Sequence, residues 1–145
     1  MGKDNKRIGN TAELEVSAKL SALGYEVSFP FGESAYDLIA NKGKKLIRIQ
    51  VKSATLSDKG SYRCALTHGT NGQNRYTKDD CDAIILYAPY SKDYSDVCID
   101  GFYIIPIKEV VKSGAQHAFL FPEGKGKGNY KTCKWEKFRN AWGKL

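Results

Sequence analysis

The sequence lacks the features that are typical of secreted proteins, of proteins with a structural zinc site and of membrane-spanning proteins. Its 145 residues include only four cysteines, and no two of them form a Cys-x-x-Cys pair. A structural zinc site normally uses such closely spaced ligands, so we do not expect one. The longest apolar run, Ala83 to Ala88, is too short to span a bilayer, and the polar start at Met1 has no signal-peptide character. These absences favour an intracellular protein with reduced thiols.

Internal repeats and linker-like segments are also absent, and a chain of this length usually forms one domain. We therefore expect a single domain over residues 1–145, with a basic extension over about residues 123–145. Acidic residues are in the minority, because 16 stand against 23 lysines and arginines and give a net charge of +7. The basic residues gather in two segments, 42–52 and 123–145. Clustered positive charge favours a polyanion such as nucleic acid as partner, with a solvated surface as the alternative.

The most informative segment that is present runs from Lys45 to Ala54. Its odd-numbered residues from Ile47 to Val51 are apolar and alternate with polar ones. A period of two is typical of a strand with one buried face. The opposite face then carries Arg48, Gln50 and Lys52.

A carboxylate is expected next to that polar face. The preceding strand, Tyr36 to Ala40, contains Asp37, and a turn at residues 41–44 joins the two strands as a hairpin. The carboxylate, the amide oxygen of Gln50 and the ammonium group of Lys52 then converge on the sheet. Oxygen ligands of this kind suit Mg²⁺, which keeps several waters and needs few protein groups, and the lysine suits a phosphate.

Each of these residues also has a purely structural alternative. Asp37 can pair with Lys52 in a modest ion pair, and Gln50 can simply face solvent on an amphipathic strand. Glu13 follows Asn10 at the spacing of a helix capping box. Considered alone, Glu13 is therefore better explained as a capping residue.

The remaining pattern predicts an α/β fold. A helix is expected from Asn10 to Gly24, and a basic helix from Lys134 to Trp142 carries aromatic residues three or four positions apart as a plausible docking stripe. The strands expected beside the two already described are Tyr25 to Pro30, Ser61 to Thr67, Asp82 to Pro89, Gly101 to Ile107 and His117 to Phe121.

These residues resemble a known family. An early helix with a glutamate, a strand with an aspartate and a strand ending in (D/E)-x-K make up the core of the PD-(D/E)XK nucleases. The sequence resembles that core at Gly9-Asn10-Thr11-Ala12-Glu13, Tyr36-Asp37-Leu38 and Gln50-Val51-Lys52. It is most similar to the group I intron-associated PD-(D/E)XK homing endonucleases, in which Gln replaces the acidic residue. The segments Phe29-Pro30-Phe31-Gly32-Glu33-Ser34 and Tyr103-Ile104-Ile105-Pro106 also resemble that group.

The resemblance implies a restriction-endonuclease-like core, with a central mixed β-sheet flanked by helices. It also implies a Mg²⁺-dependent endonuclease, with Mn²⁺ as a substitute, that cuts double-stranded DNA inside a bacterial or phage-infected cell. The implied catalytic residues are Glu13, Asp37, Gln50 and Lys52. The implied metal ligands are the side chains of Asp37, Gln50 and Glu13 and the backbone carbonyl of Val51.

Further basic residues are expected to contact DNA phosphates. A duplex break needs two sites of opposite polarity, so we expect a symmetric dimer or, by family resemblance, a tetramer. Its contacts are expected from the strands at 82–89 and 101–107 or from the aromatic helix. A Holliday junction resolvase, a repair nuclease and a catalytically decayed DNA-binding module remain as alternatives. The expected phosphate contacts are Arg48, Arg63, His68, Arg75, Lys78, Lys125, Lys127 and Lys131.

Overall fold

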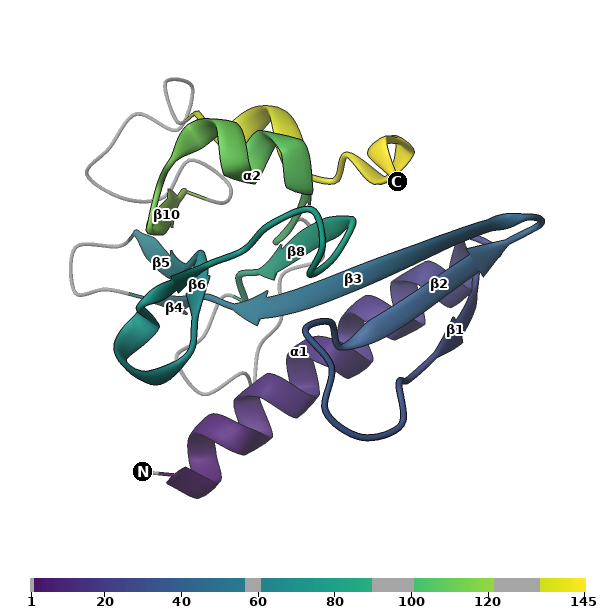
Figure 1. The fold of residues 1–145 in the computed structure, drawn as a ribbon, viewed down its shortest axis with the longest axis horizontal. Coiled ribbons are helices and arrows are strands. Elements are labelled where there is room, and N and C mark those ends of the chain that lie inside the picture. Colours follow the sequence, from purple (N-terminus) through teal and green to yellow (C-terminus); the bar gives the residue numbers. More distant parts are fainter. Residues whose placement is uncertain (1, 57–60, 90–100, 122–133) are drawn as a thin grey trace.

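The structure is a computed structural model that describes residues 2–56, 61–89, 101–121 and 134–145 (Figure 1). Its helices are α1 (Gly2–Ala22) and α2 (Ile107–Ser113), with short 3-10 helices η1 (Thr70–Gly72), η4 (Glu136–Phe138) and η5 (Trp142–Lys144). The strands are β1 (Glu26–Ser28), β2 (Leu38–Lys42), β3 (Lys45–Ser53), β4 (Thr55–Leu56), β5 (Tyr62–Ala65), β6 (Thr67–His68), β7 (Asn74–Arg75), β8 (Ala83–Tyr87), β9 (Phe102–Pro106) and β10 (His117–Leu120).

A mixed sheet forms the centre of the fold. Its five strands follow the order β1-β2-β3-β8-β9. Strand β3 runs parallel to β8, whereas the other neighbours are antiparallel. The hairpin between β2 and β3 turns at Gly43, whose φ of 63° is a conformation that glycine adopts without steric cost. The predicted α/β class with a central mixed sheet is confirmed.

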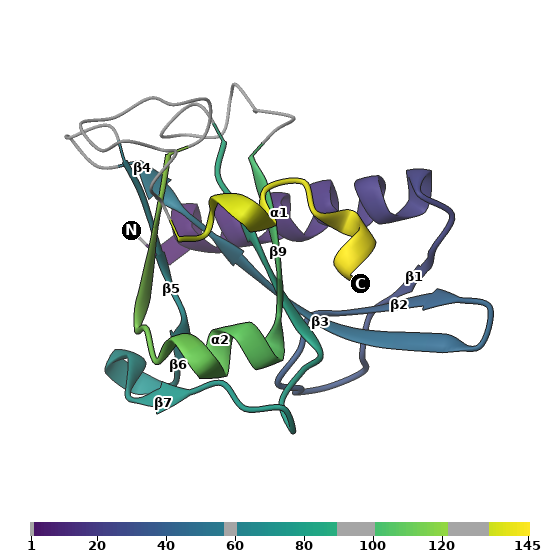
Figure 2. The same ribbon diagram turned by 90° about the horizontal axis from the view of Figure 1, so that it is seen from above.

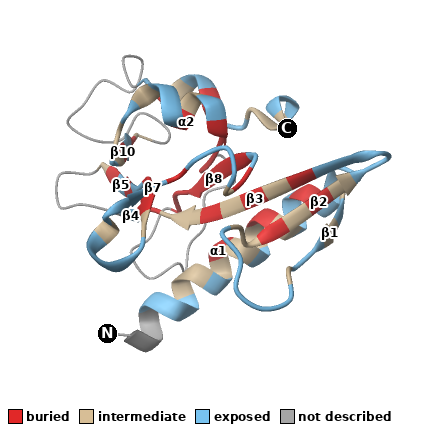
Figure 3. Cartoon of the chain, in the orientation of Figure 1, coloured by how far each residue is buried: buried red, intermediate tan, exposed pale blue. Residues whose placement is uncertain are grey.

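Apolar layers cover both faces of this sheet. Strand β8 is buried throughout, because its alternate residues face opposite sides. Ile84 and Leu86 pack with α2, β5 and β10, whereas Ile85 and Tyr87 pack with the buried side of α1. Figure 2 shows α1 and α2 on opposite sides of the sheet, and Figure 3 shows the buried residues concentrated between them. The strand that the sequence marked as most informative, β3, lies in the middle of this arrangement.

Helix α1 begins earlier than predicted. It starts at Gly2, so Asn10 lies inside the helix and cannot be its N-cap. Lys3, Lys6 and Arg7 are good helix formers and extend the helix backwards from Asn10. Thr11 shows the local geometry, because its hydroxyl donates to the carbonyl of Arg7 one turn earlier. The capping role considered for Glu13 is therefore wrong.

The predicted helix from Lys134 to Trp142 is also wrong. Only the short turns η4 and η5 form there, because Arg139 adopts an extended conformation and Asn140 has a φ of 52°. The segment pairs instead with the edge of the sheet, where the Asn140 N–H donates to the Phe102 carbonyl at 2.8 Å. Trp135 and Phe138 are buried in the core.

The surfaces expected to form a subunit contact are occupied within the chain. Strands β8 and β9 are buried, and the aromatic residues of the tail pack against the same core. Among the described aromatic residues of the tail, Trp142 alone is partly buried, so it keeps some surface for a contact with another copy. Within the described residues, none of the helices combines the length and the apolar character that a bilayer crossing requires.

Candidate active site

Asp37 is placed by the β2–β3 hairpin. It directly precedes β2, and its backbone N–H donates to the Ile49 carbonyl at 2.9 Å. Its carboxylate therefore lies beside the next residues of β3. Asp37 Oδ2 accepts hydrogen bonds from the Val51 N–H at 2.9 Å and from Gln50 Nε2 at 2.8 Å. The hairpin thus joins Asp37 directly to the Gln50-Val51-Lys52 part of the motif.

The amide group of Gln50 lies between two oxygen atoms. Its Nε2 is 2.8 Å from Asp37 Oδ2 and 3.2 Å from the carbonyl oxygen of Val51. Both neighbours are acceptors, so hydrogen-bond chemistry assigns the NH₂ end of the amide to this position. The two oxygens are those expected to ligate Mg²⁺, and the NH₂ group interacts with both of them at once.

Lys52 follows on the same face of β3 and is half-buried. Its Nζ donates to the carbonyl of Thr67 at 3.2 Å and lies 5.2 Å from the centre of the Tyr76 ring. Burial lowers the pKa of Lys52, although the charge of Asp37 opposes this effect. The ammonium group is therefore held next to the carboxylate by a backbone carbonyl and an aromatic face.

Glu13 reaches the same region from α1. Ala12 and Val16 fix the helix against the sheet, because both are buried in the core between them. Burial, followed by the nearby charge of Asp37, raises the pKa of Glu13. The carboxyl groups of Glu13 and Asp37 therefore interact electrostatically, although they come from different elements of the fold.

Partial burial also controls the charge of Asp37. It raises the pKa of Asp37, although the Val51 N–H and the charge of Lys52 act in the opposite direction. Without a cation, ionising both Glu13 and Asp37 is therefore unfavourable. A bound cation would offset this cost, because it neutralises the two negative charges. Among the described residues, no group of three or more His, Cys, Asp and Glu side chains lies close enough to hold a metal. The donor set of two carboxylates, one amide and one carbonyl nevertheless fits Mg²⁺, which keeps several waters.

A cleft of about 530 Å³ opens over these carboxyl groups. Glu13 and Asp37 lie in its wall, and the rest of the wall comes mainly from the segment between β1 and β2. Glu33 belongs to that segment and adds a third carboxylate to the wall. The cleft is lined by Glu13, Phe29, Pro30, Gly32, Glu33, Ser34, Tyr36 and Asp37.

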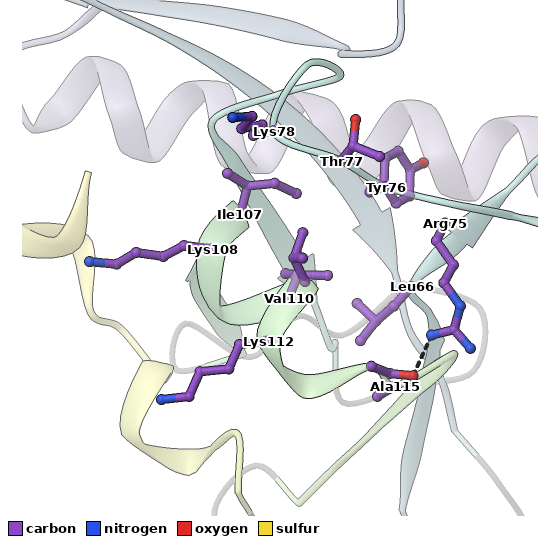
Figure 4. A pocket seen from close by; sticks show the side chains of 12 residues that line it. Leu66, Arg75, Tyr76, Thr77, Lys78, Ile107, Lys108, Val110, Lys112 and Ala115 are labelled. Carbon is purple, nitrogen blue, oxygen red and sulfur yellow. Dashed lines mark hydrogen bonds between the residues drawn. The ribbon is translucent and has the colours of Figure 1, made fainter.

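A larger cavity of about 660 Å³ lies beside α2 and contains none of the predicted catalytic residues. In Figure 4 the side chains of Ile107 and Val110, on α2, lie opposite Leu66 and Tyr76. Its lining combines aliphatic side chains with basic ones and offers no carboxylate. We therefore assign the chemistry to the smaller cleft.

The predicted phosphate contacts are spread over several surfaces. Arg48 interacts with the turn before β8, where it pairs with Asp82 at 3.0 Å and donates to the Lys78 and Asp79 carbonyls. Arg63 is exposed on β5, with its guanidinium 3.0 Å from His117 Nε2. Lys125, Lys127 and Lys131 lie outside the described residues.

The other three predicted contacts lie around Tyr76. The His68 ring is 4.6 Å from the Tyr76 ring, and its Nε2 is 4.0 Å from Asp80 Oδ2. Arg75 and Lys78 border the larger cavity, and Arg75 donates to the carbonyl of Gly114.

Sequence reasoning missed two groups that support Lys52. Tyr76 and the Thr67 carbonyl contact its ammonium group, but they lie 24 and 15 residues away from it along the chain. Neither belongs to a recognisable motif. Only the path of the chain between β5 and β8 brings them to Lys52.

Comparison with known proteins places this geometry in a family. The model of the PD-(D/E)XK endonucleases matches residues 3–136. The solved structure of the bacterial homing endonuclease I-Ssp6803I is similar to this one, with a TM-score of 0.72 and 23% sequence identity. The match covers 95% of this chain and 90% of that one. The curated proteins contain no match to the sequence. On the extent of the family match, the chain belongs to the PD-(D/E)XK endonuclease family and is a DNA endonuclease.

Proposed function

We propose that this endonuclease depends on Mg²⁺ and cuts both strands of double-stranded DNA at a specific site, as a homing endonuclease does. The observation that carries the proposal is the convergence of Asp37 Oδ2 and the Val51 carbonyl on the amide of Gln50. Similarity to a bacterial homing endonuclease supports the assignment of site-specific cleavage. We further propose that residues 1–145 act as one intracellular nuclease domain with a basic extension.

The residues that would hold Mg²⁺ are Asp37, Glu13, the Val51 carbonyl and the Gln50 side-chain oxygen after its amide has turned. Bound there, the ion supplies Lewis-acid stabilisation and a water of lowered pKa. Lys52 offers hydrogen-bond donors to a phosphate oxygen or to the attacking water. Its contacts with Thr67 and Tyr76 restrict its direction, so positioning is built into the protein before DNA binds. Mn²⁺ accepts the same oxygen ligands and is expected to substitute.

Cleavage mapping tests this proposal. Purified protein is incubated with Mg²⁺, Mn²⁺ or EDTA and a plasmid library, and the cut ends are sequenced. We expect metal-dependent cuts at a recurring sequence, and loss of cleavage in Asp37→Asn and Lys52→Met. Lys44→Met, on the exposed hairpin turn, is the matched control and should cut normally. Undiminished cleavage by either site variant contradicts the assignment.

The same assay separates the alternatives. Preferential cutting of four-way junctions over linear duplex would identify a resolvase, and cuts restricted to damaged DNA would identify a repair nuclease. DNA binding without cleavage under every metal condition would identify a decayed module. Each result is incompatible with the site-specific endonuclease proposed here.

We propose in addition that the active form is a symmetric dimer or tetramer, because one set of catalytic residues cuts one strand. A two-fold assembly presents the site twice with opposite polarity. Because β8, most of β9, Trp135 and Phe138 are buried within the chain, we expect the interface to use mainly other surfaces. Light scattering with and without target DNA provides the test. A chain that is monomeric in both conditions and still makes double-strand breaks contradicts this assembly.

A further inference from the structure

The segment between β1 and β2 presents an aromatic side chain to solvent beside the active-site cleft. Phe31 is the most exposed large hydrophobic residue in the described part of the chain, at 106% relative exposure, and Phe29 is 55% exposed. Burying such a ring is favourable, so two exposed phenyl rings in one short segment are available for a contact that buries them. Figure 1 shows this segment as a wide loop that extends away from the β2–β3 hairpin.

The loop is also a wall of the cleft. Pro30 and Gly32, on either side of Phe31, line the cleft together with Glu13 and Asp37. Phe31 itself is not part of the lining, so its ring stands at the outer rim. A phosphate placed between Asp37 and Lys52 would therefore lie next to a loop whose apex is an exposed phenyl ring.

The backbone on both sides of the ring is restrained. Pro30 fixes its own φ, and Gly32 has a φ of +83°, which L-residues rarely adopt. A Cβ at Gly32 would meet nothing within 4 Å, so glycine is favoured there by backbone conformation and not by crowding. The loop thus holds Phe31 in a defined turn at the rim.

Charge indicates which part of DNA the loop can contact. Residues 25–36 contain Glu26 and Glu33 but no lysine or arginine. The loop therefore has no cation for a phosphate, and an exposed ring suits the face of a base. A protein partner is disfavoured, because a chain covering Phe31 would also cover the mouth of the cleft that the substrate must enter.

We propose that Phe31 is a DNA-contacting residue that inserts beside the base next to the cleaved phosphate and unstacks it from its neighbour. The proposal rests on the function proposed above. Apolar side chains that enter a base step unstack it locally, and stacking contributes to affinity without reading a hydrogen-bond pattern. Phe31 would thereby open the base step next to the phosphate that Asp37 and Lys52 act on.

The test uses a duplex oligonucleotide carrying the mapped cut site, with 2-aminopurine at the base beside the scissile phosphate. Binding is measured in the Asp37→Asn background, which prevents cutting. We expect 2-aminopurine fluorescence to rise on binding. Phe31→Ala should abolish that rise and weaken affinity by roughly 5- to 150-fold, the range for loss of one stacked base. Phe31→Trp should restore both.

Phe119→Ala on β10 removes another exposed phenyl ring, at 51% exposure, and is the matched control with unchanged binding expected. Equal cleavage and equal fluorescence in Phe31→Ala and wild type would overturn this proposal while leaving the endonuclease function intact. Failure of the wild type to cut any DNA would remove the proposed function, and this inference with it. Conversion of an oligomer to monomers by Phe31→Ala would assign the ring to a second copy of the chain and also overturn the proposal.

Discussion

The Nε2 atom of Gln50 lies 2.8 Å from Asp37 Oδ2 and donates a hydrogen bond to it. The same NH₂ group is also 3.2 Å from the Val51 carbonyl, so it satisfies two oxygens that a divalent cation would otherwise bind. A cation that takes this place must displace the NH₂ group, after which the amide oxygen can turn inward. Gln50 therefore joins Asp37 to the Val51 carbonyl, and under the proposed Mg²⁺ site its amide would have to turn.

Gln50→Glu should tighten Mg²⁺ binding on the order of tenfold, because one more charged oxygen ligand joins the site. Without metal the variant should melt at a lower temperature, because the new carboxylate lies beside Asp37 and loses the amide hydrogen bond. Titration calorimetry and thermal melting with and without Mg²⁺ measure both effects. Gln73→Glu makes the same change at an exposed position and should alter neither. Unchanged Mg²⁺ affinity in Gln50→Glu would show that this side chain is not a ligand.

Asp37→Asn should leave the metal-free protein as stable as wild type, or more stable, at neutral pH. The folded protein raises the pKa of Asp37 above its ordinary value of 3.8, mainly through burial. Between 3.8 and the raised pKa, the folded state binds more protons than the unfolded state, so stability falls as pH rises. The penalty is complete above the folded pKa, and the neutral amide of the variant removes it.

Melting temperatures measured from pH 3.5 to 8 check this sign, with the window taken around the ordinary pKa of 3.8. Any advantage of Asp37→Asn should disappear at the acid end, where both states carry a neutral carboxyl group. Asp79→Asn, at an exposed turn, controls for a general loss of charge. If Asp37→Asn melts well below wild type at neutral pH only, the ionised carboxylate of Asp37 stabilises the fold and the prediction is wrong.

Tyr76→Leu should reduce the cleavage rate about 2- to 30-fold, the equivalent of a cation–π contact worth about 0.5–2 kcal/mol. Loss of the ring 5.2 Å from Lys52 Nζ removes support for the charged form, so the pKa of Lys52 should fall further. The alkaline limb of the pH–rate profile should then move to lower pH. Tyr76→Phe keeps the ring and should behave like wild type. An unshifted limb in Tyr76→Leu would limit Tyr76 to a packing role.

Replacing Lys125, Lys127 and Lys131 with glutamine should weaken DNA binding on every sequence. If each lysine neutralises one phosphate, the slope of log affinity against log salt should drop by about 0.9 for each. Filter binding at several salt concentrations measures the slope. A control variant that loses Lys19, Lys44 and Lys108 has the same net charge and should keep more of the slope. Equal slopes in the wild type and the tail variant would make these lysines a solvated surface.

The hairpin and its polar face could be predicted because their signals are local. The alternation from Lys45 onward placed Gln50 and Lys52 on one face, and a short turn fixed Asp37 beside them. The capping signal at Asn10 misled, because the residues before it also favour a helix. The tail misled for another reason: its aromatic spacing reflects burial against the sheet and not a helical stripe.

Other contacts could not be predicted, because they depend on which strands become neighbours. Arg48 contacts Asp82 across 34 residues only because β3 pairs in parallel with β8. Tyr76 contacts Lys52 only because the chain between β5 and β8 folds back over the end of β3. Pairing between strands distant in sequence leaves no periodic trace in either segment, so these partners require the fold itself.

The two faces of strand β3 differ, because Ile49 and Val51 lie in the core beside α1, whereas Gln50 contacts Asp37 and Lys52 contacts the Thr67 carbonyl. The length of β3 can therefore change by an even number of residues, but not by an odd number, without moving each side chain to the wrong face. Insertion of a single residue after Ile47 would turn each later side chain over, so that an ammonium group would enter the hydrocarbon interior. Insertion of two residues would restore the faces and shift the site by one pleat. In the divergence of this nuclease, odd-numbered insertions or deletions within β3 should therefore be eliminated even where a substitution at the same position is tolerated.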